Sequence, residues 1–373
     1  MQQSLEKIFK GKTVLVTGHT GFKGSWLSIW LKELGANVVG YSLPPPTNPN
    51  LFGVAELQQK LTHVVGDVRD FSKLSQTIAS YQPQIIFHLA AQSLVLPSFD
   101  QPKETFDTNA GGTINLLEAC RAKDNIQAVV IITTDKCYDN KEWVWGYREN
   151  DPLGGSDPYS SSKAMAELAV ASYRKSFFHG TTPVATTRAG NVIGGGDFSS
   201  FRLMPDTMKA MIKGDPVSIR NPHSIRPWIH VLDPLYGYLL LTERLITKGQ
   251  EYAEAWNFGP LEQGKITTKM IVEKAISLWG EGDYWINEST TINGKPEMNA
   301  LRLNWDKAAN RLEWRPAYNW EQAVVKTVDW FKSFQQQCQM YNVCVQHIHD
   351  YTNTPRKNEI YTNTPEKSFS HRS

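Results

Sequence analysis

The sequence predicts a doubly wound α/β fold, in which helices cover both faces of a parallel sheet. From Thr13 onward, short β-branched runs alternate with longer helical patterns, an order that produces right-handed crossovers between parallel strands. A glycine-rich loop, "TGHTGFKG", follows the first of these runs. The 373 residues suffice for a large core and a second, smaller lobe.

The expected strands are short runs rich in valine, isoleucine and threonine. They cover residues 13–17, 37–42, 62–66, 84–90, 128–134 and 183–189, and a further short strand covers 255–260. Between the strands, apolar residues recur at helical spacing. The expected helices cover residues 24–34, 71–81, 103–122, 160–177 and 205–213.

The composition excludes several classes of partner. Lys and Arg total 39 against 37 Asp and Glu, a net charge of +2, which predicts neither nucleic acid nor an anionic membrane as a partner. No run approaches the roughly 18 apolar residues of a membrane span, and the N-terminus lacks the core of a signal peptide. We therefore expect a cytoplasmic protein. Four scattered cysteines predict no disulfide framework. Cys338 and Cys344 lie near His347 and His349, but "CQMYNVCVQHIH" lacks the close pairing of zinc ligands, and we expect a helix with ordinary packing residues there.

The glycine loop lies where the first strand ends and the first helix begins. Gly18 permits a tight turn, Gly21 lets the backbone approach phosphate, and Gly24 lets the helix pack closely. Helix amides then face the phosphate. This order of strand, loop and helix predicts a dinucleotide-binding (Rossmann) domain.

The end of the second strand decides between NAD and NADP less clearly. Tyr41 and Ser42 stand where an acidic residue normally holds the adenosine ribose. No arginine stands there to meet a 2′-phosphate, although Lys23 in the glycine loop could contribute a positive charge, and we therefore predict NAD. Asp67 follows the third strand, where it is placed to accept from the adenine amino group.

The domain boundaries follow from a change after "GNVIGGGDF", where the regular alternation of strand and helix patterns ends. We expect the dinucleotide-binding domain to span 1–194, with 228–259 returning to it. Residues 195–227 and 260–340 then form an interleaved substrate lobe. We expect 341–373 to be a polar tail, in which "YTNTP" occurs twice, at Tyr351–Pro355 and Tyr361–Pro365.

A catalytic constellation is predicted by two motifs. Tyr159 and Lys163 are four residues apart in a helical pattern, which places both on one face. An ammonium beside the phenol would lower the tyrosine pKa from about 10 toward the working pH, as a base requires. Thr134 ends the fifth strand, and Asp135 and Lys136 follow it as an adjacent acid and base in "TTDKCYD".

These motifs, with "NAGGTINLLEA", "RAGNVIG" and "RPWIHVLD", resemble the extended short-chain dehydrogenase/reductase family over roughly residues 10 to 335. The resemblance implies that Thr134, Tyr159 and Lys163 oxidise a sugar hydroxyl while nicotinamide takes the hydride. The cofactor contacts that it implies, together with those above, are Gly18, Gly21, Phe22, Lys23, Gly24, Ser42, Asp67, Val68, Leu89, Ala90, Ala91, Asn109, Tyr159 and Lys163.

Within that family, the chain resembles the nucleotide-sugar 4,6-dehydratases and, among these, the CDP-glucose branch, through "TTDKCYDN" and "GYRENDPLGGSDPYSSSK". This resemblance implies C4 oxidation, loss of water across C5 and C6, and hydride return to C6. Asp135 would protonate the leaving hydroxyl. Lys136 would act either as the C5 base, once burial has lowered its pKa, or as an electrostatic stabiliser of the enolate.

The substrate contacts implied by the resemblance are Ser93, Asn191, Arg202, Arg226 and Glu297, with both arginines directed to the pyrophosphate. The preference for cytosine and a role in O-antigen and lipopolysaccharide biosynthesis rest on resemblance alone, as does a homodimer or homotetramer. The alternatives are another 4,6-dehydratase, a 4-epimerase, or a cofactor-binding regulator without catalysis.

Overall fold

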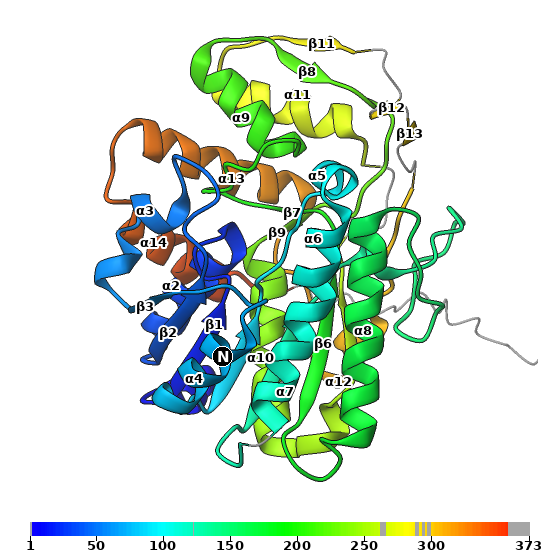
Figure 1. Cartoon of the computed structure of the whole chain (residues 1–373). Helices are drawn as coiled ribbons and strands as arrows, with labels where there is room; N and C mark the ends of the chain where they lie inside the picture. Colours follow the sequence, from blue (N-terminus) through cyan, green and yellow to red (C-terminus); the bar gives the residue numbers. More distant parts are fainter. Residues whose placement is uncertain are drawn as a thin grey trace, which may run out of the picture.

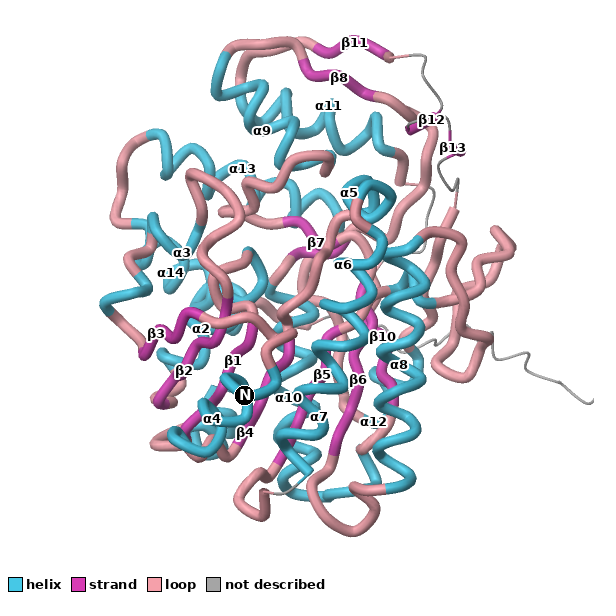
Figure 2. The backbone as a smooth tube through the Cα atoms, viewed as in Figure 1, coloured by secondary structure: helices cyan, strands magenta, loops and turns pink. Residues whose placement is uncertain are grey.

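In the computed structural model, a seven-stranded sheet forms the centre of the molecule (Figures 1 and 2). The structure describes residues 2–121, 123–261, 266–287, 291–292, 295–296 and 300–356. The strand order is β10-β6-β5-β4-β1-β2-β3, and every neighbouring pair is parallel. The predicted doubly wound fold is confirmed. The strands are β1 (Thr13–Thr17), β2 (Asn37–Ser42), β3 (Thr62–Val65), β4 (Ile85–His88), β5 (Ala128–Ile132), β6 (Val184–Ala189) and β10 (Ala255–Phe258).

Alternate residues of the buried strands pack into two separate cores. In β5, Val130 and Ile132 pack on one side of the sheet, whereas Val129 and Ile131 pack on the other. Because successive side chains of a strand point to opposite faces, a continuous apolar run fills both cores. The first core is covered by α2 (Phe22–Glu33), α10 (Leu232–Lys248) and α14 (Met340–Asn353), and the second by α4 (Phe71–Tyr81), α7 (Gly112–Arg121) and α8 (Pro158–Ser176).

The path of the chain reverses at the centre of the sheet. It builds β2 and β3 outward on one side of β1 and then returns to β4 on the other side. In open α/β sheets, ligands bind at such a switch point, outside the carboxyl ends of the strands. The ends of β1, β4 and β5 are therefore the expected floor of the active site.

A smaller lobe lies beyond this carboxyl edge, at the top of Figure 1. It contains α9 (Leu203–Lys213), β8 (Val217–Ile219), α11 (Thr268–Trp279) and β11 (Tyr284–Ile286), and β8 pairs with β11 in parallel. Between α9 and α11 in sequence, β10 lies back in the main sheet. Close to the junction, β7 (Val192–Ile193) pairs with β9 (Ile229–His230).

The predicted polar tail from residue 341 is wrong in its first part, because residues 340–353 form α14. Cys344, Ile348 and Tyr351 of this helix are buried in the main core. The Tyr351 hydroxyl donates to Asp233 Oδ1 at 2.8 Å. Although α14 contains many polar residues, its apolar residues recur at helical spacing and form one face that packs against the core. The second "YTNTP" copy lies outside the described residues.

The predicted helix over 103–122 is interrupted. It forms α6 (Pro102–Phe106), the π turn η2 (Asp107–Gly111) and then α7. In the described part of the chain, no helix is both long and apolar enough to cross a bilayer. The remaining elements are α1 (Gln2–Phe9), α3 (Leu51–Val54), η1 (Leu57–Gln59), α5 (Val95–Asp100), η3 (Asp135–Cys137), η4 (Gly249–Tyr252), β12 (Thr291–Ile292), β13 (Lys295–Pro296), α12 (Asp306–Arg311) and α13 (Trp320–Gln335).

Candidate active site

The glycine loop joins β1 to α2 at the switch point. Gly18 has a φ of +74°, and a Cβ there would lie 2.6 Å from the Ala90 backbone nitrogen. A Cβ on Gly24 would lie 2.1 Å from the Gly18 carbonyl oxygen, so this position must also be glycine. Gly21 caps α2 without a side-chain hydrogen bond. The first amides of α2 can therefore face an anion such as a pyrophosphate.

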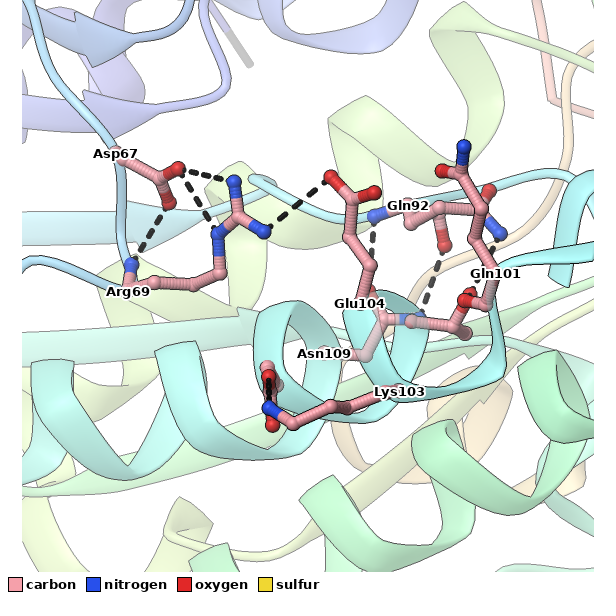
Figure 3. Close-up of polar contacts among 9 residues, drawn as sticks. Asp67, Arg69, Gln92, Gln101, Lys103, Glu104 and Asn109 are labelled. Atoms are coloured by element: carbon pink, nitrogen blue, oxygen red, sulfur yellow. Dashed lines mark hydrogen bonds and ion pairs between the residues drawn. The ribbon is translucent and has the colours of Figure 1, made fainter.

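The ends of β2 and β3 form the edge where adenosine contacts were predicted. Ser42 Oγ lies 2.9 Å from Thr20 Oγ1. Arg69, which sequence reasoning missed, donates to Asp67 with Nη2 2.6 Å from Oδ2 and also reaches Glu104 at 3.3 Å (Figure 3). Its hydrogen bonds hold the pKa of Asp67 below the usual range. Because two carboxylates already engage Arg69, it is a poor partner for a 2′-phosphate.

Asn109 connects the end of β4 to α8. Its Oδ1 accepts from the Gln92 amide nitrogen, and its Nδ2 donates to the Gln92 carbonyl (Figure 3) and to the Ser162 hydroxyl, each at 2.9 Å. Asn109 lies in the π turn η2, a distortion that is frequent at functional sites. Its side chain therefore positions the chain after β4, and its contact with a cofactor stays a prediction.

The small residues after β4 lie against the glycine loop. The Ala90 amide donates to Thr17 Oγ1 at 3.2 Å, and the Leu89 amide donates to the Thr17 carbonyl at 3.1 Å. Ala91 follows directly. Val68 is buried, and a Cβ on Gly112 would lie 2.6 Å from its Cγ2. The predicted middle of the cofactor site is therefore walled by closely packed backbone.

Thr134 organises the end of β5. It caps the turn η3 by accepting a hydrogen bond from the Lys136 amide at 3.3 Å, and its hydroxyl donates to Asp135 Oδ1 at 3.0 Å. Thr134 is also hydrogen-bonded to the Tyr159 side chain. Lys163, one helical turn after Tyr159 on α8, donates from Nζ to the Ile132 carbonyl at 3.2 Å. The structure thus brings the five predicted catalytic residues together, with Lys136 the most exposed of them.

Burial controls the ionisation of Tyr159. It raises the pKa of this phenol to about 12, and the hydrogen bond with Thr134 and the charge of Arg202 oppose it only partly. We predicted that Lys163 would lower this pKa, and in the described structure this is wrong. Desolvation of the phenolate outweighs the nearby positive charge. Burial likewise lowers the pKa of Lys163 to about 8, although Glu167 opposes the shift.

Asp135 is 2% exposed, and burial raises the pKa of its carboxyl group. The charge of Lys136 and the hydrogen bond from Thr134 act in the opposite direction, as do two more distant cations, Arg226 and Lys23. Within the described residues, Asp135 Oδ2 has no hydrogen-bond partner. Such a carboxyl group is disposed to hold a proton and to donate it.

Lys23, in the glycine loop, lies near Lys163 and Asp135 and interacts with their charges. Burial, together with the charges of Arg202 and Lys163, lowers the pKa of its ammonium to about 8, and Asp135 and Asp197 oppose the shift. Lys23 therefore interacts electrostatically with residues of the candidate active site.

Two of the predicted substrate residues contact each other. Arg202 caps α9, with Nη1 3.0 Å from Asp197 Oδ2 and Nη2 donating to the Ser93 hydroxyl at 2.9 Å. Arg226 acts electrostatically on Asp135 and so lies near this carboxyl group. Asn191 lies between β6 and β7, where its carbonyl accepts from the Ile229 amide at 3.1 Å. Glu297 lies outside the described residues.

Sequence reasoning missed a polar network beneath this site. Glu167 is on α8, four residues after Lys163, and forms a buried ion pair with Arg188 of β6 at 2.8 Å. Tyr138 and Asn257 extend the network. The spacing Tyr159, Lys163, Glu167 repeats at helical intervals and was the available signal.

Among the described residues, no three His, Cys, Asp or Glu side chains are grouped so that they could hold a metal ion. Cys344, which the sequence places near two histidines, lies in the core, where the Trp330 ring nitrogen is 3.3 Å from its sulfur.

Comparison with solved structures gives the same fold. A dTDP-glucose 4,6-dehydratase from Bacillus anthracis, solved in complex with NAD, is 25% identical with a TM-score of 0.73, covering 89% of this chain and 100% of that chain. A UDP-glucose 4-epimerase from Thermotoga maritima, solved with UDP-glucose, is 21% identical with a TM-score of 0.73, covering 87% and 99%. The second likeness concerns the fold alone, so the fold does not separate dehydration from epimerisation.

Sequence comparison is more specific. A CDP-glucose 4,6-dehydratase from Salmonella typhimurium is 48% identical over 336 residues, which are 88% of this chain and 93% of the relative. The family model described as GDP-mannose 4,6 dehydratase matches residues 15–327. Together with the predicted catalytic residues at the end of β5, these matches show that the chain belongs to the GDP-mannose 4,6 dehydratase family.

Proposed function

We propose that this protein is an NAD-dependent CDP-glucose 4,6-dehydratase, which converts CDP-glucose to CDP-4-keto-6-deoxyglucose and water. The observation that carries the proposal is the turn η3, which places Asp135 and Lys136 directly after Thr134, with Thr134 hydrogen-bonded to Tyr159. The similarity to a CDP-glucose 4,6-dehydratase over most of the chain supports the nucleotide.

The glycine loop and the first amides of α2 fit the pyrophosphate of NAD, because a Cβ at Gly18 or Gly24 would collide with backbone atoms. Bound there, NAD would supply the hydride acceptor for the oxidation at C4 and the hydride donor for the reduction at C6. The Bacillus anthracis relative was solved with NAD. Arg69 is already paired with two carboxylates, so it is a poor partner for the 2′-phosphate that distinguishes NADP from NAD.

Tyr159 takes the proton of the 4-hydroxyl, and Thr134 orients that hydroxyl. With a pKa of about 12, the phenol is protonated at neutral pH in the described structure. Tyr159 therefore gains base strength only in the complex with its ligands. Lys163, buried next to the β5 end, adds positive charge behind it.

Asp135 protonates the departing 6-hydroxyl, which leaves as water. The raised pKa of this carboxyl and its unpartnered Oδ2 suit a proton donor. Lys136 is the partly exposed member of the turn. It acts either as the base that removes the C5 proton or as the cation that stabilises the enolate.

Arg202 and Arg226 bind the pyrophosphate of the substrate, with Ser93 and Asn191 beside them. The hydrogen bond between Arg202 and Ser93 holds this arginine beside the segment that follows β4. We also propose a homodimer or homotetramer, since α7 and α8 pack together and expose Ile114, Met165 and Leu168. A cytoplasmic location and a role in O-antigen biosynthesis stay predictions.

The test is incubation of the purified protein with NAD and, separately, CDP-, dTDP-, UDP- and GDP-hexoses. We expect CDP-glucose alone to give the alkali-induced absorbance of a 4-keto-6-deoxy sugar and a product lighter by one water, without net NADH. Dehydration of another nucleotide sugar would show that the assignment of CDP as the nucleotide is wrong. An epimer of unchanged mass would instead favour the 4-epimerase alternative, and cofactor binding without turnover would favour a regulator.

A further inference from the structure

A buried ion pair lies directly behind the catalytic turn. Arg188 Nη2 and Glu167 Oε2 are 2.8 Å apart, and each side chain is 3% exposed. An isolated buried pair is weak evidence for stability, because desolvation of the two charges offsets their attraction. The other partners of this pair suggest what it does.

The carboxylate of Glu167 holds the residue before the catalytic turn. One of its oxygens accepts from the Thr133 hydroxyl, and the other accepts from the Thr186 hydroxyl at 2.8 Å. Thr133 immediately precedes Thr134. The pair therefore anchors the point at which the chain leaves β5 and enters η3.

The guanidinium of Arg188 holds the residue after the turn. Its Nη1 donates to the Tyr138 hydroxyl at 2.8 Å and to the Glu149 carbonyl at 3.0 Å. The Tyr138 hydroxyl in turn donates to Asn257 Oδ1 at 2.7 Å. Since Tyr138 is the C-terminal cap of η3, the turn is fixed at both ends by one buried network.

We propose that Glu167, Arg188 and Tyr138 are positioning residues that orient Asp135 and Lys136 for the elimination step. This inference rests on the proposed function. The C4 oxidation depends on Tyr159 and on Thr134, which adjoins the anchor at Thr133, whereas the elimination depends on Asp135 and Lys136, which lie between Thr134 and the anchor at Tyr138. Loosening the far anchor at Tyr138 should therefore slow the elimination more than the hydride transfer.

The step that should slow is the elimination of water across C5 and C6. The C5 proton departs, the C5–C6 double bond forms, and the 6-hydroxyl leaves with the proton of Asp135 as water. The hydride taken from C4 then adds to C6, and a proton adds to C5. When the elimination becomes limiting, the enzyme should hold reduced cofactor and 4-keto-glucose during turnover.

The test is Tyr138→Phe in the full-length protein, with Tyr173→Phe as the matched control. Tyr173 is on the same helix as Glu167, and its hydroxyl contacts Glu118 at the surface at 3.3 Å. We expect Tyr138→Phe to lower kcat roughly 10- to 100-fold, because small misplacements of catalytic groups have effects of this size. KM should change less than about twofold, since no pyrophosphate contact is altered.

Two further readouts separate positioning from a general structural loss. In Tyr138→Phe, absorbance of bound reduced cofactor should rise in the steady state, and the isotope effect with C5-deuterated substrate should increase while the C4 effect falls. Tyr173→Phe should match the wild type in both. A Tyr138→Phe enzyme whose kcat falls with no reduced cofactor and an unchanged C5 effect would overturn the inference.

Arg188→Lys provides a second variant, because it keeps a charge opposite Glu167 but loses the planar fork that also reaches Tyr138. It should show the same shift in isotope effects, and an Arg188→Lys enzyme with wild-type partitioning would contradict the proposal. If this variant does not fold, Tyr138→Phe decides alone. A wild-type enzyme that dehydrates no nucleotide sugar would sink the proposed function and this inference with it, whereas an active wild type with an unaffected Tyr138→Phe would sink the inference alone.

Discussion

Lys163 and Glu167 lie one turn apart on α8 and are almost equally buried, at 6% and 3% exposure, yet burial affects their charges differently. Lys163 hydrogen-bonds to one carbonyl, and burial lowers its pKa to about 8. Glu167 is also desolvated, but Arg188 and two threonine hydroxyls together hold its pKa below the usual range. The comparison teaches that the number of partners, more than depth, decides whether a buried group stays charged.

The two sets of residues therefore have different tasks. The upper set, Thr134, Asp135, Tyr159 and Lys163, keeps protons that can move, because its buried groups lack full compensation. The lower set, Glu167, Arg188, Tyr138 and Thr186, is joined by several buried hydrogen bonds and an ion pair, which hold its geometry. Changes in the upper set should affect rate, and changes in the lower set should affect stability and positioning.

The largest effect is expected for Tyr159→Phe, which removes the proposed base from the upper set. The kcat should fall about 1,000-fold, within the usual contribution of a general base. Because the C4 hydroxyl cannot be deprotonated, no reduced cofactor should form in a single turnover. Detection of reduced cofactor at the wild-type rate would assign the base to another group.

Glu167→Gln is the corresponding change in the lower set. It leaves Arg188 buried without its counter-charge and should lower the free energy of unfolding by about 3–5 kcal/mol. In the wild type this stabilisation should be present at neutral pH and lost as the pH falls through the lowered pKa of Glu167. Urea denaturation across the acidic range measures both effects. Glu118→Gln, an exposed ion-pair partner of Arg121, should have no measurable effect.

Asp135→Asn should lower activity about 100-fold by removing the proposed acid, while the protein becomes more stable at neutral pH. The sign follows from the raised pKa. The stabilising protonated form is complete at acidic pH and is lost as the pH rises through the folded-state pKa, so a neutral amide gains most above it. Thermal unfolding at several pH values compares the two proteins. If the wild type and Asp135→Asn were equally stable at every pH, burial of the charged Asp135 carboxylate would not destabilise the protein.

Thr186→Val should have the smallest effect of the four. It removes one hydrogen bond to the Glu167 carboxylate while keeping the side-chain shape. The unfolding free energy should fall by about 1.5 kcal/mol, the lower end for a hydrogen bond to a charged group. The rate should stay near that of the wild type, because the ion pair and the Tyr138 anchor remain. A loss as large as that of Glu167→Gln would contradict the idea that the ion pair and the remaining hydrogen bonds hold the network.

Much of the fold and the site was accessible from the sequence, because the signals are local. β-branched runs followed by helical patterns predicted all seven strands of the sheet. The spacing of Tyr159 and Lys163 placed both on one face of α8. The polar tail was predicted to begin too early, at residue 341, because the apolar stripe of α14 is diluted by polar residues. The contact between Arg69 and Glu104 was missed because the two residues are 35 positions apart in the sequence.

By itself, the sequence determined the order of the elements, the glycine loop and the identity of the acid and base after β5, since each depends on residues a few positions apart. Only the tertiary structure decided their chemical state. Folding buried Tyr159 deeply enough to reverse the predicted pKa shift, and it joined Glu167 on α8 to Arg188 on β6 behind the catalytic turn. Desolvation and the pairing of charges distant in sequence arise only when the chain is packed, so no local sequence pattern could predict them.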